Sequence, residues 1–247
     1  MSGIRVERSG PLLTVILDNP ARHNAQTPSM WAALADVKAQ IDPDVRVVAV
    51  WGEGASFSAG LDRRLLAAEP VDGETTLAAI PVSERDAFVR AAQSAFTWWG
   101  EVDAITIALV QGHAIGAGFQ LALACDLRIV APDAKFAMRE TSLGLVPDLA
   151  GTRPLVEAIG YSRALEICAT GRFVDADEAL RIGLATAIVP QEQWSGWMDQ
   201  AFAPILAADP RAVAELKHLL KGAAGNERQC DREREAQLRR LTALMPS

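Results

Sequence analysis

The sequence predicts an α/β core followed by a helical C-terminal region. Apolar runs typical of buried strands alternate with apolar residues at helical spacing as far as residue 189, which is the pattern of βα units. Two stretches, VAVWGEGASFSAGLD and IALVQGHAIGAGFQL, repeat one plan of a strand, a glycine turn and small residues. We therefore expect stacked repeats of one supersecondary unit. From Pro190 onward the spacing of the apolar residues is helical only.

Length and composition describe a globular protein with one large core. Half of the 247 residues are hydrophobic. The net charge of −7 and the pI near 5.1 argue against a broad nucleic-acid surface, which needs clustered Lys and Arg. No signal-peptide pattern opens the chain, and no apolar run approaches the roughly 20 residues that span a bilayer. We expect a cytoplasmic protein that binds neither nucleic acid nor membrane, with its three cysteines reduced.

The first elements follow from local signals. The run LLTVIL, residues 12–17, predicts a strand that ends in the turn DNP. Thr27 is an N-cap with Pro28 at the first helical position, and apolar residues at helical spacing carry this helix to Ile41. The run VRVVAVW, residues 45–51, is almost continuously apolar, so we expect a strand buried on both faces.

Later elements are predicted from the same signals. Residues 67–83 contain prolines and no sustained period, which favours a loop. Strands are expected at 105–110, 127–130 and 185–189. Helices are expected around 88–98, from about 119, and at 152–159, 162–169, 175–182, 191–206, 211–220 and 227–244.

The stretch from Gly112 to Asp148 carries the strongest functional signal. A strand turns through Gly112 and further small residues before a helix begins, and a helix that starts on bare backbone directs unpaired N–H groups outward. The matching turn of the other repeat places a second set of N–H groups at the same edge, one near Leu61 and one near Ala117. Two converging donors suit a developing oxyanion. The alternative is that these glycines serve only tight packing.

Two carboxylates and several absent motifs narrow the chemistry. Glu140 and Asp148 are candidate acid/base groups, separated by apolar residues that we expect to raise the pKa of Glu140. No P-loop, dinucleotide fingerprint or G-x-S-x-G elbow occurs. With three histidines in the chain, a three-histidine metal centre is not expected, and we predict no metal site.

Four segments together resemble the enoyl-CoA hydratase/isomerase family, also called the crotonase family. They are NPARHNA (19–25), SFSAGLD (56–62), GHAIGAGFQLALACDLRI (112–129) and FAMRETSLGLVPDLAGT (136–152), and they occur in the family's order over nearly the whole chain. The resemblance implies a crotonase-like spiral of ββα repeats with a C-terminal helical oligomerisation region. It also implies acyl-CoA thioester substrates and no separate cofactor, because CoA is part of the substrate.

The resemblance assigns roles residue by residue. The oxyanion hole falls on the backbone N–H groups of Leu61 and Ala117, where the family usually has Ala and Gly. Glu140 matches the family's second catalytic glutamate, and Gln120 occupies the place of the first. Asp148 stands where dienoyl-CoA isomerases have an additional acid. The chain ends without the family's usual Phe and Lys/Arg tail, which leaves the contact of that tail with CoA in doubt.

The CoA moiety is expected across the mouth formed by 22–25 and 59–64. Basic side chains in these segments can meet phosphates on an otherwise acidic protein, or they form a solvated basic cluster. The predicted substrate-binding residues are Arg22, His23, Ala25, Ala59, Gly60, Leu61, Asp62, Arg63, Gly116 and Ala117, with Arg64 beside them.

The number of catalytic bases in the predicted site favours double-bond isomerisation over hydration. Hydration of a 2-enoyl thioester needs a water held between two carboxylates, and Gln120 can orient a water but cannot accept its proton. A single base, Glu140, suffices to move a double bond from C3 to C2 through a dienolate. The alternatives are a hydratase in which Asp148 assists, and an acyl-CoA-binding protein without turnover.

The chain is expected to divide into two regions. Residues 1–189 form the ββα core with the acyl-CoA site, and residues 190–247 form a helical trimerisation region. A helical tail with apolar residues is hard to bury alone, so we expect it to pack on partner subunits in a homotrimer or a dimer of trimers.

Overall fold

A six-stranded sheet forms one wall of the protein. The computed structural model describes residues 3–66, 73–74 and 76–223, and the statements below refer to these. The sheet order is β1-β2-β3-β4-β6-β9, and only the β1–β2 pair is antiparallel. The bounds are Ile4–Ser9 (β1), Leu12–Leu17 (β2), Val47–Gly52 (β3), Ile105–Val110 (β4), Leu127–Val130 (β6) and Ala187–Ile188 (β9).

The strands of a smaller sheet come from successive repeats of the spiral. It contains β5 (His113–Ile115), β7 (Lys135–Ala137) and β8 (Val174–Asp175). Strands β4 and β5 precede α3, and β6 and β7 precede η7 and α4, so each repeat gives one strand to each sheet. A single ladder joins Ser58, Ala114, Phe136 and Val174 across successive repeats. The predicted stacking of ββα units is confirmed.

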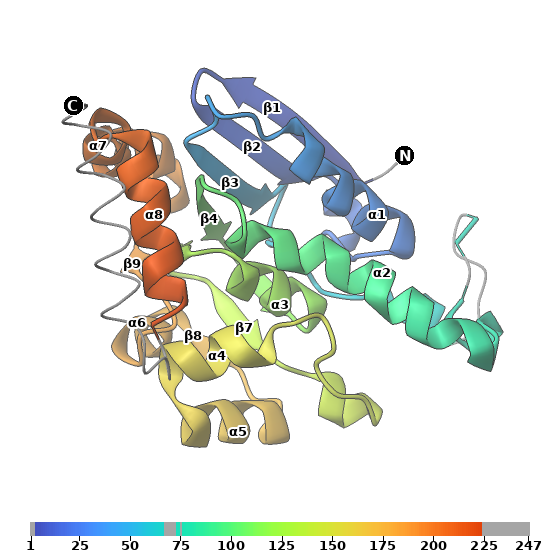
Figure 1. Cartoon of the computed structure of the whole chain (residues 1–247). Helices are drawn as coiled ribbons and strands as arrows, with labels where there is room; N and C mark the ends of the chain where they lie inside the picture. Colours follow the sequence, from blue (N-terminus) through green and yellow to red (C-terminus); the bar gives the residue numbers. More distant parts are fainter. Residues whose placement is uncertain (1–2, 67–72, 75, 224–247) are drawn as a thin grey trace.

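Eight α-helices pack on these sheets within the described residues (Figure 1). Their bounds are Pro28–Asp36 (α1), Arg85–Thr97 (α2), Ala117–Ala124 (α3), Thr152–Ile159 (α4), Tyr161–Thr170 (α5), Ala176–Arg181 (α6), Trp194–Ala207 (α7) and Pro210–Lys221 (α8). Short 3₁₀ turns lie at Pro20–Arg22 (η1), Val37–Gln40 (η2), Arg63–Leu65 (η3), Leu77–Ala79 (η4), Val82–Glu84 (η5), Trp98–Gly100 (η6), Glu140–Leu143 (η7) and Gln191–Gln193 (η8). None of the described helices is long and apolar enough to cross a membrane.

Helices cover both faces of the large sheet. One core cluster joins the sheet to α1, α2 and α3, and every residue of α3 from Ala117 to Leu123 is buried. A second cluster lies on the opposite face, where Trp194 and Phe202 of α7 pack on Ile107 and Ile129. Strands buried on both faces read as continuous apolar runs, which is why β3 and β4 were predictable.

Several boundaries differ from the sequence prediction. The Thr27 cap is confirmed, since its side chain accepts a hydrogen bond from the Met30 N–H. Strand β1 was not predicted, because IRVERS is exposed on an antiparallel edge and shows little apolar signal. The expected strand at 185–189 is only Ala187–Ile188. The expected helix at 227–244 lies outside the described residues.

Helix α8 is held to the core by a buried lysine. The Lys217 Nζ lies 2.8 Å from the Asp126 carboxylate and donates to the carbonyls of Ala104 at 2.7 Å and Trp99 at 3.3 Å. By contrast, Leu216 and Leu220 of the same helix are 54% and 66% exposed. The helix therefore buries a charge and exposes two leucines, which is the reverse of an ordinary surface helix.

Candidate active site

The two glycine turns are pressed against each other. A Cβ on Gly112 would lie 2.0 Å from the Ala55 carbonyl oxygen, and one on Gly60 would lie 2.3 Å from that of Ile115. Such distances are far below van der Waals contact, so both positions require glycine, and Gly60 also has a φ of +82°. The tight packing that we considered as an alternative is real. The same packing brings the two turns together, so the two interpretations do not exclude each other.

Two unpaired backbone N–H groups lie side by side where the turns meet. In the described part of the chain, neither the Leu61 N–H nor the Ala117 N–H has a hydrogen-bond partner, because the surrounding bonds use Gly60, Asp62 and Gly116. A Cβ on Gly60 would be 3.3 Å from the Ala117 nitrogen, so the two donor segments are in contact. Ala117 is the first residue of α3, whose N-terminus adds a favourable field for negative charge. The arrangement suits an oxyanion.

The Glu140 carboxylate lies beside Gly116, the residue that precedes Ala117. Gly116 has a φ of +52°, and a Cβ there would be 3.4 Å from Glu140 Oε1 and 3.8 Å from Oε2. A side chain at this position would fill the space between the carboxylate and the start of α3. The structure thus brings together the Leu61 and Ala117 N–H groups and the predicted base.

Burial raises the pKa of Glu140 above its ordinary value, and the nearby charge of Asp148 adds to the effect. The backbone N–H of Glu140 itself and the hydrogen bond from Gln120 act in the opposite direction. The Oε2 atom is buried and has no partner among the described residues. The direction of the pKa shift and its largest cause, burial, agree with our expectation. The apolar residues between the two carboxylates are themselves exposed: Leu143, Leu145 and Val146.

Gln120 connects Glu140 to the segment that carries Asp148. Its Nε2 donates to Glu140 Oε1 at 2.7 Å, and its Oε1 accepts from the backbone N–H groups of Leu149 at 2.9 Å and Gly151 at 3.3 Å. Asp148 is exposed as a residue, yet desolvation of its carboxyl group raises its pKa. Gln93 of α2 donates to the Asp148 carbonyl at 2.7 Å.

Three of these supporting residues were not predicted from the sequence: Gln93, Leu149 and Gly151. Two of them act through backbone N–H groups, which every residue type has, so their identities carried no signal. A Cβ on Gly151 would lie 2.7 Å from Gln120 Cγ, so the glycine is needed for contact with Gln120. The glycine in LAGT was a signal that could have been used.

The segment around Arg22 is bound to the segment around Gly60. The Ala59 N–H donates to the His23 carbonyl, and the Gln26 N–H donates to the Gly60 carbonyl. His23 is in the left-handed region with a φ of 50°, and Ala25 is buried behind it. The predicted substrate-binding residues of the two segments are therefore neighbours in space.

Only part of the predicted basic cluster is exposed. Arg22, His23 and Arg63 are exposed. Arg64 instead forms an ion pair of 2.7 Å with Asp62, whose carboxylate also caps η3, and this hydrogen bond lowers the pKa of Asp62. Both members of this pair therefore fix the loop after Leu61.

Among the other titratable groups, Cys168 lies near Glu140: burial and then the Glu140 charge raise the pKa of its thiol. His113 is exposed and packs edge-on against Phe173. Cys125 is buried and Cys168 is partly buried. In the described ranges, no three His, Cys, Asp or Glu side chains are grouped as a metal site.

A spiral of ββα units with paired N–H donors and a carboxylate beside them defines a class of enzymes that act next to a carbonyl group. Residues 7–244 match the model of the family described as "Enoyl-CoA hydratase/isomerase". The chain belongs to this family, the crotonase family, as the resemblance indicated.

Named relatives and solved structures agree with this assignment. The chain is 34% identical over 194 residues to a Mycobacterium tuberculosis protein (strain CDC 1551 / Oshkosh) named as an enoyl-CoA hydratase, covering 76% of this chain and 69% of the relative. It is 31% identical over 220 residues to the carnitinyl-CoA dehydratase of Salmonella enteritidis PT4, covering 88% and 80%.

A Thermobifida fusca YX structure named as an enoyl-CoA hydratase, in complex with acetoacetyl-CoA, has a TM-score of 0.94 and 41% identity. The alignment covers 98% of this chain and 96% of that one. A second structure from the same organism contains CoA, with a TM-score of 0.93 and 41% identity over 98% and 94% of the two chains. The chain is thus a crotonase-family acyl-CoA enzyme. The preference for isomerisation that we drew from the sequence gains no support, since these relatives are named for hydration and dehydration.

Proposed function

We propose that this protein adds water to, or removes water from, the enoyl group of an acyl-CoA thioester. The observation that carries the proposal is the position of the Glu140 carboxylate beside Gly116, next to the unpaired N–H of Ala117, with a second carboxyl group, Asp148, close enough to raise the pKa of Glu140. The relatives named as hydratases and dehydratases support this reaction.

In the proposed reaction, the thioester oxygen accepts hydrogen bonds from the N–H groups of Leu61 and Ala117. These donors stabilise the enolate that forms as the oxygen of the water bonds to C3. Glu140 takes a proton from the attacking water, and Asp148 in its acid form gives a proton to C2, so that OH and H add across the double bond. One carboxyl group must be ionised and the other protonated, and burial raises the pKa of both, which is the direction that holding a proton requires.

Isomerisation of a 3-enoyl-CoA remains the second candidate function. It is favoured by one observation: Gln120 holds the place of a catalytic carboxylate, and its carbonyl oxygen is already bonded to two backbone N–H groups. In this mechanism Glu140 alone carries the proton from C2 to C4.

For CoA we propose the mouth formed by residues 22–25 and 59–64. Arg22, His23 and Arg63 are the exposed cations that can pair with phosphates. Arg64 is committed to Asp62, so we no longer assign it to the ligand. The thioester end then lies between Gly60 and Gly116, whose missing side chains leave the donors open.

A direct comparison of reactions tests the proposal. Crotonyl-CoA and a 3-enoyl-CoA are incubated side by side with wild type, Glu140→Gln and Asp148→Asn, and products are separated by chromatography. We expect hydration of crotonyl-CoA, reduced about 10²–10⁴-fold in each variant. Isomerisation that is faster than hydration and insensitive to Asp148→Asn would establish the second candidate. Tight acyl-CoA binding without either product would establish a binding protein.

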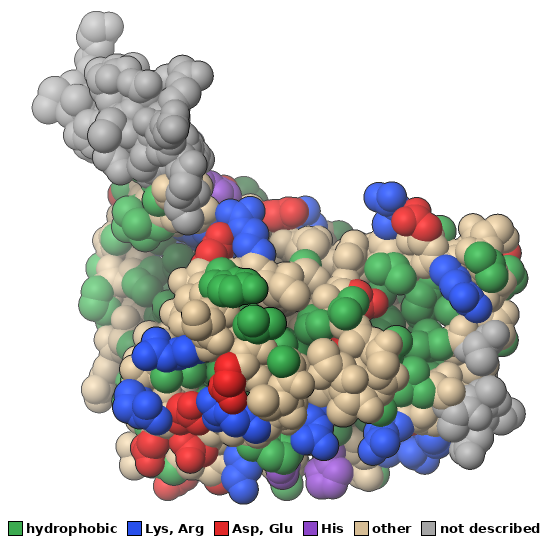
Figure 2. Space-filling view, turned by 90° about the horizontal axis from the view of Figure 1, so that it is seen from below, with side chains coloured by type: hydrophobic (Ala, Val, Ile, Leu, Met, Phe, Trp, Pro, Cys, Tyr) green, Lys and Arg blue, Asp and Glu red, His purple; other side chains and the backbone are tan. Residues whose placement is uncertain are grey.

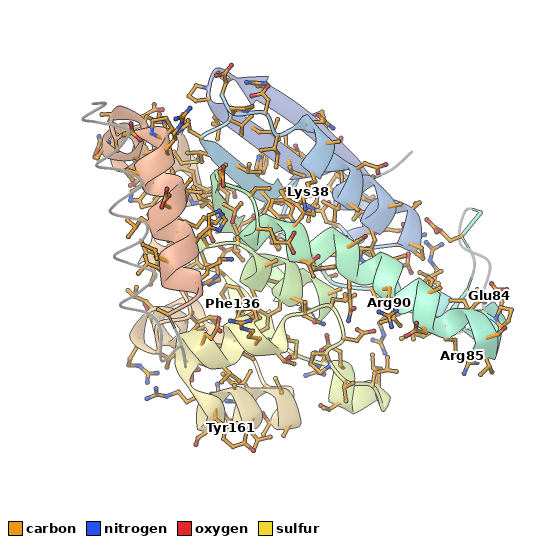
Figure 3. The ribbon with its side chains drawn as sticks, viewed as in Figure 1. Lys38, Glu84, Arg85, Arg90, Phe136 and Tyr161 are labelled. Carbon is orange, nitrogen blue, oxygen red and sulfur yellow. The ribbon has the colours of Figure 1, made fainter. Side chains whose placement is uncertain are left out.

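We also propose that the C-terminal region assembles trimers, or trimers paired into hexamers. Support comes from apolar residues that are exposed in the described part of the chain: Leu216 and Leu220 on α8 in this region, and Tyr161 and Leu165 on α5, which would extend the contact onto the core. Figure 2 shows apolar side chains exposed among polar ones on the lower face, and Figure 3 shows Tyr161 at the lower end of the molecule. Residues of this size gain about 1.5–3 kcal/mol each when fully buried, so a partner subunit would stabilise them. Residues 1–189 then form the catalytic core and 190–247 the assembling region.

A further inference from the structure

We propose that Gln120 is a positioning residue that gives the two oxygens of Glu140 different tasks and holds Asp148 in the same unit. This inference rests on the proposed function in that it concerns the same carboxylates. It replaces the expectation that Gln120 orients a water molecule. Three geometric facts carry it: the direction of the Gln120 amide, the confinement of its side chain, and the unequal surroundings of the Glu140 oxygens.

The direction of the Gln120 amide is fixed by its partners. The backbone N–H groups of Leu149 and Gly151 can only donate, so the atom that they meet must be the carbonyl oxygen. The NH₂ group is thereby turned toward Glu140 Oε1, 2.7 Å away. A flipped amide would leave two backbone donors facing an NH₂ group, and it would place a carbonyl oxygen against a carboxylate. Both changes cost free energy in a buried site.

The side chain of Gln120 has no room to leave this position. Gln120 is 1% exposed and lies on α3, the most buried helix of the core. Gly151 presses on it so closely that an added Cβ would lie 2.7 Å from Gln120 Cγ and 3.1 Å from its Oε1. An amide that is confined and fully bonded on its carbonyl side cannot turn that oxygen toward a substrate water.

The two oxygens of Glu140 are therefore not equivalent. Oε1 accepts a hydrogen bond from Gln120, which makes it a poorer proton acceptor. Oε2 is buried without a partner among the described residues and is available for a proton. We assign proton transfer to Oε2 and the anchoring of the carboxylate to Oε1.

The carbonyl side of Gln120 extends the unit to the second carboxyl group. Asp148 directly precedes Leu149, whose N–H is bonded to Gln120, and the Asp148 carbonyl accepts from Gln93. The peptide group that follows the Asp148 Cα is thus held at its C=O and at its N–H. One glutamine fixes the Glu140 carboxylate through its NH₂ and the peptide next to Asp148 through its carbonyl oxygen.

A glutamate in place of Gln120 would not act as an independent second base. Its inner oxygen would accept the two backbone hydrogen bonds, and its outer oxygen would face Glu140 Oε1 at the 2.7 Å now spanned by an N–H donor. Two carboxyl oxygens at that distance share one proton, as like charges so close cannot both ionise. The pair would hold its proton to higher pH than Glu140 does now.

The test uses Gln120→Met, which keeps the length and apolar volume but removes all three hydrogen bonds. Gln111→Met is the matched control, because Gln111 is also a buried glutamine. Its NH₂ donates to the carbonyls of Gly52 and Gly54, and neither of these residues contacts Glu140 or Asp148 through Gln120. The ionisation of Glu140 is followed by NMR on protein labelled with ¹³C at glutamate carboxyl groups, with Glu140→Gln used to assign the signal. This readout needs no turnover.

We expect the pKa of Glu140 to rise in Gln120→Met and to stay unchanged in Gln111→Met, because a donor to a carboxylate stabilises its charged form. The acidic limb of the kcat/KM profile should move to higher pH in parallel, and kcat should fall about 10- to 100-fold with a smaller change in KM. If Gln120→Met does not fold, Gln120→Glu keeps the shape and should show a coupled titration with a raised pKa.

Two results overturn the proposal: an unchanged Glu140 titration in a folded Gln120 variant, or faster hydration in Gln120→Glu than in wild type. Absence of turnover in wild type would instead refute the proposed function, and the NMR titration would still decide the role of Gln120.

Discussion

Replacing Ala117 by proline should remove one of the two N–H donors while leaving the fold intact. Ala117 is the first residue of α3, where proline's fixed φ is well suited and where its N–H makes no hydrogen bond in the described structure. The preceding Gly116 has a ψ of −116°, away from the helical ψ that a following proline disfavours. Loss of one oxyanion donor typically costs about 2.7–4 kcal/mol, so we expect kcat to fall about 10²–10³-fold. Because no existing bond is broken, the melting temperature should change by only a few degrees, roughly.

The assay compares turnover of crotonyl-CoA with thermal unfolding for Ala117→Pro and for Ala117→Val. The valine adds similar bulk to a residue that is 6% exposed but keeps the N–H, so it separates steric from hydrogen-bonding effects. A proline variant that is as active as the valine variant would refute the assignment of this N–H to the oxyanion. If both variants lose activity equally, bulk and not the donor is responsible.

Further predictions follow from buried charges and exposed leucines. Glu140→Gln should melt at a higher temperature than wild type at pH 7 to 8 but not near pH 4. Burial raises the pKa of Glu140 in the folded protein, so the wild-type protein loses stability as the pH rises through that folded-state pKa, whereas below the ordinary pKa of the carboxyl group no stability is lost. Lys217→Met should destabilise the fold in denaturant titrations by less than the about 3–5 kcal/mol of a fully unpaired buried charge, since Asp126 loses its buried partner but keeps Lys221 at 3.3 Å. The double variant Leu216→Glu, Leu220→Glu should reduce the mass measured by light scattering without unfolding the subunit, and an unchanged mass would contradict the trimer proposal.

The strands that the sequence predicted best are those in which successive residues are nearly all buried. Strands β3 and β4 lie in the middle of the sheet, so their residues are almost all apolar and their positions were readable. Strand β1 lies at the edge and pairs on one side only, which leaves its side chains exposed and its pattern polar. The short strand β5 was missed because three residues carry no period, although its register fixes Ala114 between Ser58 and Phe136.

The site was predictable to the extent that residue type determines its chemistry. Glycine turns and carboxylates are specific residue types, so Gly60, Gly116 and Glu140 could be identified from the sequence. The direction of a side chain could not, and Gln120 is the example: its place beside Glu140 followed from the family, but its bonds to the segment after Asp148 did not. Likewise, nothing in the sequence indicated that Arg64 would pair with Asp62 instead of remaining available to a phosphate.

The features proposed for catalysis are those that cost the folded protein stability. The Leu61 and Ala117 N–H groups and the Glu140 Oε2 lack partners within the described structure, and a buried polar atom left in this way, as Oε2 is, costs about 1–3 kcal/mol. Gly116 adds a left-handed backbone at the same point. These costs are tolerable because the repeats around them are tied by the ladder through Ser58 and by the bonds of Gln120. A substrate that supplies a carbonyl oxygen to the donors and a proton to Oε2 removes them, which makes the empty site higher in free energy than the occupied one. Saturating acyl-CoA should therefore raise the melting temperature of wild type more than that of Ala117→Pro, in which one of the unpaired donors is absent.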